Sequence, residues 1–240
     1  MARILLTNVN DYTGPGAVAV MLREGHTVLC HDPTFTDENT RTAFERDHSG
    51  AVALVSDEPE ALAAEVERLG PLDGFVSNDA YPNTKRLVEE VPLDELRATF
   101  ERVLVFPFHL TQRLLPAMKR RGEGSIVFVT SARDTRPEPG FAVPTTIRAG
   151  TTAFAKAVAK EVAPYQVSVN VVAPNYLYSE LYYPRARFMD DPDGRDLIQR
   201  TVPFGRLGRP DEIGELIAFL VSGRSPFTTG QVVGFTGGWP

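Results

Sequence analysis

The sequence predicts an α/β protein in which a doubly wound parallel sheet carries helices on both faces. Its 240 residues, of which 42% are hydrophobic, can bury one substantial core, and chains of about 200–250 residues commonly form one α/β domain. Short apolar segments alternate with longer amphipathic ones, which is typical of parallel strands joined by helices. Neither a linker nor an internal repeat interrupts this alternation, so we expect residues 1–240 to form a single domain.

Seven segments are predicted as strands, in chain order: "RILLT" (3–7), "TVLCHD" (27–32), "AVALV" (51–55), "GFVSND" (74–79), "SIVFVTS" (125–131), "VSVNVVAPN" (167–175) and "QVVGFTGG" (231–238). Helices are predicted near 15–24, 58–69, 93–120, 146–163 and 210–222. The last begins with "RPDE", where Pro210 stands near the first helical position and acids occupy the first turn. Residues 176–205 follow the sixth strand without a clean period, and we expect this loop region to cover a ligand crevice.

Composition and charge restrict the partners of the protein. The formal net charge is −6, with basic residues scattered among acids, which argues against binding to nucleic acid or to an anionic membrane and favours a small-molecule partner. Cys30 is the only cysteine, so no intrachain disulfide forms, and no Cys/His cluster has metal-ligand spacing. The apolar run in "MARILLTNVN" is too short for a signal peptide or a membrane span, and we expect a reducing, cytoplasmic location.

The pattern "SIVFVTS" before "IRAG", together with the ending "RLGRPDEIGELIAFLVSGRSPFTTGQVVGFTGG", resembles the short-chain dehydrogenase/reductase superfamily. The resemblance covers nearly the whole chain. It implies a Rossmann-like fold and a homotetramer in which the helices 93–120 and 146–163 form one interface.

The cofactor loop of that superfamily is altered here. The family pattern Thr-Gly-x-x-x-Gly-x-Gly aligns with residues 7–14, and only its last glycine, Gly14, is present. Asn8 tolerates a positive φ, but Tyr12 places a ring where phosphate and nicotinamide would lie, which predicts that no nucleotide binds. The alternative is that Tyr12 points outward and the nucleotide still binds. Asp32 could hold a ribose hydroxyl, but we favour its interpretation as a solvated strand-end acid that caps the next turn.

Other departures point in the same direction. Asp79 in "VSNDAY" replaces a family alanine and is expected to face the site. The segment "APNYLYSE" stands where a Pro-Gly pair opens onto the nicotinamide, so Asn175 and Tyr176 crowd that region. The catalytic asparagine of the family falls near Val103. The helix lysine of the reductases is Arg148 in "TIRAG". With Ser131 seventeen residues earlier, this combination resembles the halohydrin dehalogenases, a branch that converts vicinal haloalcohols to epoxides without a cofactor.

The resemblance implies a set of site residues. Ser131 matches the serine that holds the substrate oxygen, and Arg148 matches the arginine of the catalytic set, with Asp79 as an acid near it. The remaining matches are the loop aromatic and the wall of the halide pocket: Tyr12, Pro174, Asn175, Tyr176 and Leu177. Epoxide closure removes a proton from the hydroxyl while a halide leaves, and backbone amides and ring edges suit such a weakly hydrated anion.

The tyrosine base of that branch is missing. It belongs thirteen residues after Ser131 and four before Arg148, and both counts lead to Pro144. Pro144 is also an ordinary residue for the first turn of a helix. Substitutes for the base are Thr145, or a tyrosine from the covering segment: Tyr176, Tyr178, Tyr182 or Tyr183.

Each assignment has a structural alternative, because Ser131 could only cap a turn and Arg148 could only pair with Asp79. Three functions therefore remain open. The first is a cofactor-independent dehalogenase acting on a small haloalcohol or epoxide, with a halide or similar small anion as its second ligand. The second is an NAD(P)-dependent oxidoreductase, and the third is a non-catalytic homologue that binds a small ligand.

Overall fold

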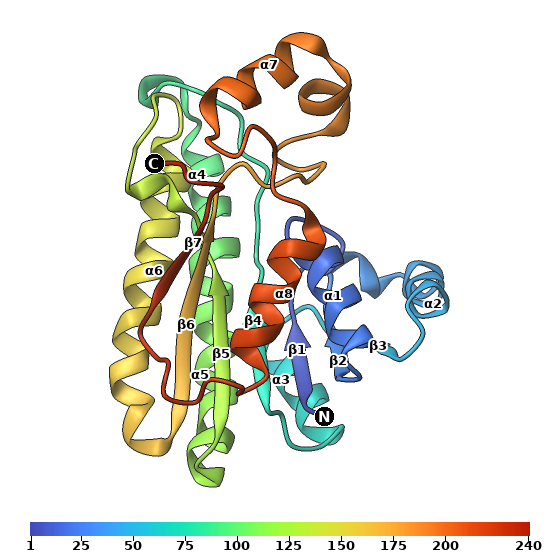
Figure 1. Ribbon diagram of the computed structural model, residues 1–240. Coiled ribbons are helices and arrows are strands. Elements are labelled where there is room, and N and C mark those ends of the chain that lie inside the picture. Colours follow the sequence, from blue (N-terminus) through green and yellow to red (C-terminus); the bar gives the residue numbers. More distant parts are fainter.

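The computed structural model describes all 240 residues and contains a seven-stranded sheet between two layers of helices (Figure 1). All strands are parallel, in the order β3-β2-β1-β4-β5-β6-β7. They are β1 (Arg3–Leu6), β2 (Thr27–Cys30), β3 (Ala51–Ala53), β4 (Gly74–Ser77), β5 (Gly124–Val129), β6 (Val167–Pro174) and β7 (Val232–Phe235). Each predicted strand is present, and the order reverses between β1 and β4. The prediction of a doubly wound parallel sheet is thus confirmed.

The five predicted helices are present, with two further helices. The bounds are α1 (Gly14–Arg23), α2 (Glu38–Asp47), α3 (Pro59–Arg68), α4 (Leu93–Phe100), α5 (Phe106–Arg121), α6 (Ala142–Val162), α7 (Pro192–Thr201) and α8 (Pro210–Val221). The predicted helix 93–120 is divided into α4 and α5 by one π-helical turn, Glu101–Val105. None of the helices is both long and apolar enough to cross a membrane.

Both faces of the sheet are buried, which explains the continuous apolar runs of its strands. Leu5, Phe75 and Phe128 point to the core shared with α3, α5 and α6. Their neighbours Ile4 and Val76 belong to the opposite core, under α1 and α8. Because side chains alternate along a strand, each apolar run supplies both cores at once.

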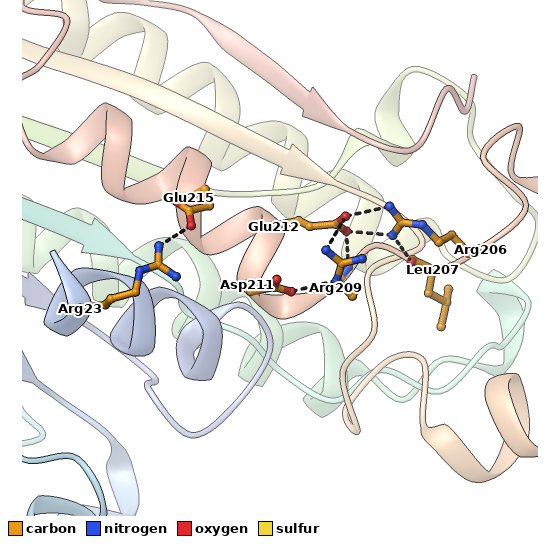
Figure 2. Close-up of polar contacts among 7 residues, drawn as sticks. All are labelled: Arg23, Arg206, Leu207, Arg209, Asp211, Glu212 and Glu215. Atoms are coloured by element: carbon orange, nitrogen blue, oxygen red, sulfur yellow. Dashed lines mark hydrogen bonds and ion pairs between the residues drawn. The ribbon is translucent and has the colours of Figure 1, made fainter.

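Helices α1 and α8 approach each other through glycine. A Cβ on Gly16 would lie 1.9 Å from the carbonyl oxygen of Pro210, and one on Gly214 would lie 2.5 Å from the carbonyl oxygen of Gly16. Figure 2 shows Arg23 of α1 paired with Glu215 of α8. Both positions therefore require glycine, because any larger residue would separate the two helices.

The segment 176–205 lies beyond the carboxyl ends of the strands, at the top of the molecule in Figure 1. It is not a loop throughout, because it contains a π-helical turn, Ala186–Asp190, and the helix α7. The sequence did not predict α7, since only Gly194 and Ile198 of its ten residues are buried.

Candidate functional site

A cavity of about 540 Å³ opens at the carboxyl ends of the strands. Its walls come from the chain after β1, β4, β5 and β6 and from the first turns of α6. This is the place where open α/β sheets bind ligands. Eight of the nine predicted site residues line it: Tyr12, Ser131, Thr145, Arg148, Pro174, Asn175, Tyr176 and Leu177.

Ser131 stands just beyond the end of β5, at the start of a short 3₁₀ turn, Ala132–Asp134. Its hydroxyl oxygen accepts a hydrogen bond from the backbone amide of Arg133 at 3.2 Å. The serine thus caps the turn, as the structural alternative expected, while also lining the cavity. Because a capping hydroxyl uses only an acceptor position, its O–H remains available to donate to a ligand oxygen.

Arg148 is a buried cation, with 6% of its surface exposed. One guanidinium nitrogen donates to the carbonyl oxygen of Val129 at 2.7 Å, and another lies 3.5 Å from the phenol oxygen of Tyr182. The guanidinium carbon lies 5.2 Å from the centre of the Tyr12 ring. Burial acts to lower the pKa of Arg148, but the phenols of Tyr182 and Tyr12 outweigh it, and the pKa is raised.

Asp79 differs from the expectation that it faces the site. It is buried but does not line the cavity. One carboxylate oxygen accepts hydrogen bonds from the hydroxyls of Thr7 at 3.0 Å and Ser77 at 2.8 Å, and the other oxygen has no partner. No ion pair joins Asp79 to Arg148; the carboxylate influences the arginine only through its charge. The acid stabilises the ends of β1 and β4, because its partners lie there.

The loop between β1 and α1 bends with two left-handed residues, Asn8 at φ 53° and Tyr12 at φ 58°. This conformation turns the Tyr12 ring inward, where it is 8% exposed and its hydroxyl donates to the carbonyl oxygen of Thr130 at 2.9 Å. Burial raises the pKa of Tyr12 far above its ordinary value, so its phenol stays protonated. The outward orientation considered from the sequence is not the one observed.

This loop does not fit the pyrophosphate of a nicotinamide nucleotide. A phosphate site needs free backbone amides, yet the protein itself accepts the hydrogen bonds of five of them: Val9, Asn10, Asp11, Thr13 and Gly14. Asp32 uses both carboxylate oxygens, on the amide of Asn10 and on the amide and hydroxyl of Thr34. It caps a turn as predicted, although it is buried rather than solvated. Burial and the nearby Asp32 raise the pKa of Asp11.

Pro144 is the third residue of α6 and lines the cavity beside Thr145. The hydroxyl of Thr145 is buried and has no hydrogen-bond partner. Three of the four tyrosines of the covering segment that could replace the base line the cavity: Tyr176, Tyr182 and Tyr183. Leu177 lies in the same wall. Tyr178, another candidate substitute for the base, does not line the cavity and donates instead to Glu180.

Tyr182 is the phenol that lies next to Arg148. Its hydroxyl donates to the carbonyl oxygen of Tyr81 at 3.0 Å, and its ring meets the Tyr12 ring edge-on at a centroid distance of 5.1 Å. The other two phenols are held elsewhere. Tyr183 donates to Asn175 at 2.9 Å, and burial raises its pKa. Burial raises the pKa of Tyr176 to about 12.

Sequence reasoning missed three cations of the cavity wall, Lys85, Arg133 and Arg187. Arg133 follows Ser131 by two residues, so its place near the serine could have been inferred from the strand end. Lys85 belongs to an irregular segment, 78–87, and Arg187 to the short π-helical turn Ala186–Asp190, and no periodicity in the sequence predicts the course of either. The charged run "RARFMDDPDGRD" (185–196) is largely exposed, but Arg187 within it reaches the cavity.

Comparisons with known proteins show the family of this chain. The family described as enoyl-(acyl carrier protein) reductase matches residues 14–240. The 3-oxoacyl-[acyl-carrier-protein] reductase of Escherichia coli is 30% identical over 242 aligned positions, covering 98% of this chain and 95% of the relative. A solved structure described as a dehalogenation enzyme has a TM-score of 0.95 and 37% identity, covering 100% of this chain and 98% of that one.

A halohydrin dehalogenase bound to ethyl (2S)-oxiran-2-ylacetate also has a TM-score of 0.95, with 32% identity, and covers 100% of this chain and 97% of that one. The reductases and the dehalogenases thus share one fold with this protein, whose loop after β1 has its backbone amides bonded within the protein. The chain belongs to the short-chain dehydrogenase/reductase superfamily and, within it, is similar to the halohydrin dehalogenases.

Proposed function

We propose that the protein is a cofactor-independent lyase that interconverts vicinal haloalcohols and epoxides. The observation that carries this proposal is the buried guanidinium of Arg148, which faces the cavity with a phenol at 3.5 Å and without a carboxylate partner. A buried cation that no acid neutralises stabilises a phenolate or another developing anion. In the loop between β1 and α1, five backbone amides already donate to acceptors within the protein, which supports a reaction without a nucleotide. A cytoplasmic location is part of the proposal and rests on the single, free Cys30.

The reaction needs three functions from the cavity. Ser131 donates a hydrogen bond to the substrate hydroxyl and positions its oxygen. A base takes the hydroxyl proton while this oxygen attacks the neighbouring carbon, so that one carbon–oxygen bond forms and the carbon–halogen bond breaks. The halide leaves with the bonding electron pair toward the wall formed by Tyr12 and residues 174–177. Epoxide opening by a small anion is the reverse of these steps.

We propose Tyr182 as the base in place of the tyrosine that Pro144 replaces. Its phenol is the one adjacent to Arg148, with a guanidinium nitrogen 3.5 Å from the phenol oxygen that would take the proton. Thr145 is a weaker candidate, because an aliphatic hydroxyl is much less acidic than a phenol. The carbonyl of Tyr81 accepts the Tyr182 proton at 3.0 Å and opposes its loss. This opposition predicts slow turnover compared with a site whose tyrosine contacts only the arginine and the substrate.

Halide release from a small vicinal haloalcohol tests the proposal. We expect wild type to release halide in the absence of any nucleotide, and Arg148→Ala and Tyr182→Phe each to lower kcat by about a hundredfold or more. Tyr178→Phe is the matched control, since Tyr178 belongs to the same segment but does not line the cavity. Rapid release that survives both Arg148→Ala and Tyr182→Phe would exclude this site.

Non-catalytic binding of a small ligand is the second candidate, and Pro144 is the observation that favours it. The same assay separates the two functions. A protein that binds bromide, as measured by quenching of tyrosine or tryptophan fluorescence, but releases no halide from any haloalcohol would be a binding homologue.

A further inference from the structure

We propose that the substrate of this site carries a carboxylate, so that the protein acts on small haloalcohol or epoxide acids rather than on neutral molecules. The inference rests on the proposed function and names its substrate class. It comes from the charges that line the cavity, which differ in sign from the charge of the whole chain.

Four cations and one acid line the cavity: Lys85, Arg133, Arg148, Arg187 and Glu138. The whole chain has the opposite balance, with 25 Lys and Arg against 31 Asp and Glu. The cations come from separate segments, after β4, after β5, within α6 and after β6. A protein of net negative charge repels anions at long range, so a cavity enriched in cations attracts an anionic ligand against that background.

Three of these four cations, Lys85, Arg148 and Arg187, form no ion pair within the protein. The only ion pair among the five groups joins Arg133 to Glu138, at the long distance of 4.0 Å. Arg133 and Lys85 lie 3.8 Å and 5.9 Å from the centre of the same ring, Phe141. Arg187 lies 5.1 Å from the Phe188 ring. Aromatic faces hold the cations in place without removing their charge, which leaves them available to a ligand.

The cations also occupy two depths. Arg148 is buried beside Tyr12 and Tyr182, whereas Lys85 and Arg187 are exposed at the cavity mouth. A leaving halide and a hydroxyl need only the inner groups near Ser131 and Arg148. The outer cations therefore have no part in the proposed bond changes and fit a second, permanent charge on the substrate. A carboxylate matches the planar guanidinium of an arginine, and the cavity volume suits a small organic acid.

Binding of unreactive ligands tests this inference separately from catalysis. The probes are 3-hydroxybutanoate and its neutral counterpart 3-hydroxybutanamide, which lack a leaving group, with dissociation constants measured by calorimetry. We expect wild type to bind the acid about tenfold more tightly than the amide, a preference that falls as salt is added. The double variant Lys85→Gln/Arg187→Gln should reduce the preference to about threefold or less.

Lys156→Gln/Lys160→Gln is the matched control, because both lysines are exposed on α6, outside the cavity, and the change in charge is the same. Equal binding of acid and amide by wild type would overturn the inference, as would an equal loss of preference in the control. Halide release is then measured with 4-chloro-3-hydroxybutanoate and 4-chloro-3-hydroxybutanamide. Release from both at equal kcat/KM would support the proposed function but refute the substrate class. Selective binding of the acid without any release would refute the function and support the ligand class.

Discussion

Because Pro144 stands where the resemblance predicts a tyrosine base, anion binding and proton abstraction can be tested separately in this cavity. The wall proposed to face a leaving anion consists of Tyr12 and residues 174–177, and the hydrogen bonds of Tyr12 and Tyr176 do not involve Pro144. The proposed proton abstraction, in contrast, depends on a group beside Arg148. Anion binding and turnover should therefore respond differently to changes at position 144.

Pro144→Tyr should raise haloalcohol turnover by about tenfold or more. Residue 144 precedes Arg148 by one helical turn, so a phenol there lies on the same face of α6 as the guanidinium. The proline contributes no amide donor, and the first turn of a helix leaves its amides free in any case, so the helix should tolerate the change. The measurement is kcat for halide release across pH.

Pro144→Phe is the control for this prediction, since it restores the ring and the amide without the hydroxyl. Bromide affinity should stay within about twofold of wild type in both variants, because the anion wall is unchanged. An equal gain in kcat from Phe and Tyr would show that the proline limits turnover through the helix rather than through a missing base.

For single residues, the sequence predicted which side chains line the same cavity better than it predicted the contacts that each of them makes. Ser131, Arg148 and residues 174–177 line one cavity because they follow the ends of adjacent parallel strands, which chain order already implies. The orientation of Asp79 was not predictable, since it depends on hydroxyls of Thr7 and Ser77 that lie on two strands. Nor could the sequence select Tyr182 among four tyrosines, because the course of an irregular segment decides which phenol reaches the arginine.

Among the elements, the loop between β1 and α1 decides whether a nucleotide binds. We expect no heat of binding for NADH or NADPH at millimolar concentration, because five amides of the loop are already bonded within the protein and Tyr12 fills the space beside them. Isothermal titration calorimetry checks this, with bromide as a positive control for an intact cavity. A micromolar dissociation constant for either nucleotide would contradict the arrangement of the loop.

One carboxylate at the start of α8, that of Glu212, accepts several hydrogen bonds, as Figure 2 shows. Glu212 accepts two bonds from the guanidinium of Arg206, at 2.7 Å and 2.9 Å, and one from the backbone amide of Arg209 at 2.8 Å. These hydrogen bonds, above all those from the Arg206 guanidinium, lower the pKa of Glu212 from 4.5 to about 2. The family signature "RLGRPDE" thus encodes a charged cap that fixes α8.

Glu212→Gln should lower the free energy of unfolding by about 1–2 kcal/mol at neutral pH. A carboxylate with a lowered pKa stabilises the fold fully above its ordinary value of 4.5, and this contribution is lost as the pH falls toward about 2. The difference between wild type and variant should therefore shrink below pH 4.5, as measured by urea denaturation at several pH values. Glu215→Gln, which removes only an exposed pair with Arg23, should cost less. A difference that is constant with pH would show that the carboxylate charge is not responsible.

The elements that the sequence missed share a physical reason. Helix α2 buries only Phe44, so its sequence has no apolar stripe to mark it. The π-helical turn between α4 and α5 was predicted as part of one long helix, because a π-helix differs from an α-helix in its backbone hydrogen bonds, which span one residue more per turn. There Thr151 of α6 donates to the carbonyl oxygen of Val103 at 3.0 Å. The family resemblance places the catalytic asparagine of the reductases near Val103.

The molecule as a whole exposes large apolar side chains on α4 and α5. Leu93 is 56% exposed, Phe100 is 46% exposed and Phe108 is 47% exposed. Monomeric proteins seldom leave such side chains grouped in solvent, and we propose that a second copy of the chain covers this face, as the family resemblance implies.

We therefore expect a homotetramer with four times the chain mass of 26.4 kDa in light scattering at micromolar concentration. Leu96 and Phe100 are one helical turn apart on α4. Replacing both with Glu should place four negative charges in a two-fold interface formed by α4, two from each chain. The mass measured by light scattering should then fall to that of a dimer or monomer, while the circular dichroism spectrum stays unchanged. Val55→Glu is the control, since Val55 is 49% exposed after β3, on the opposite edge of the sheet from β7. A monomeric wild type would refute the assembly, and a tetramer that persists in the double variant would exclude α4 from its interface.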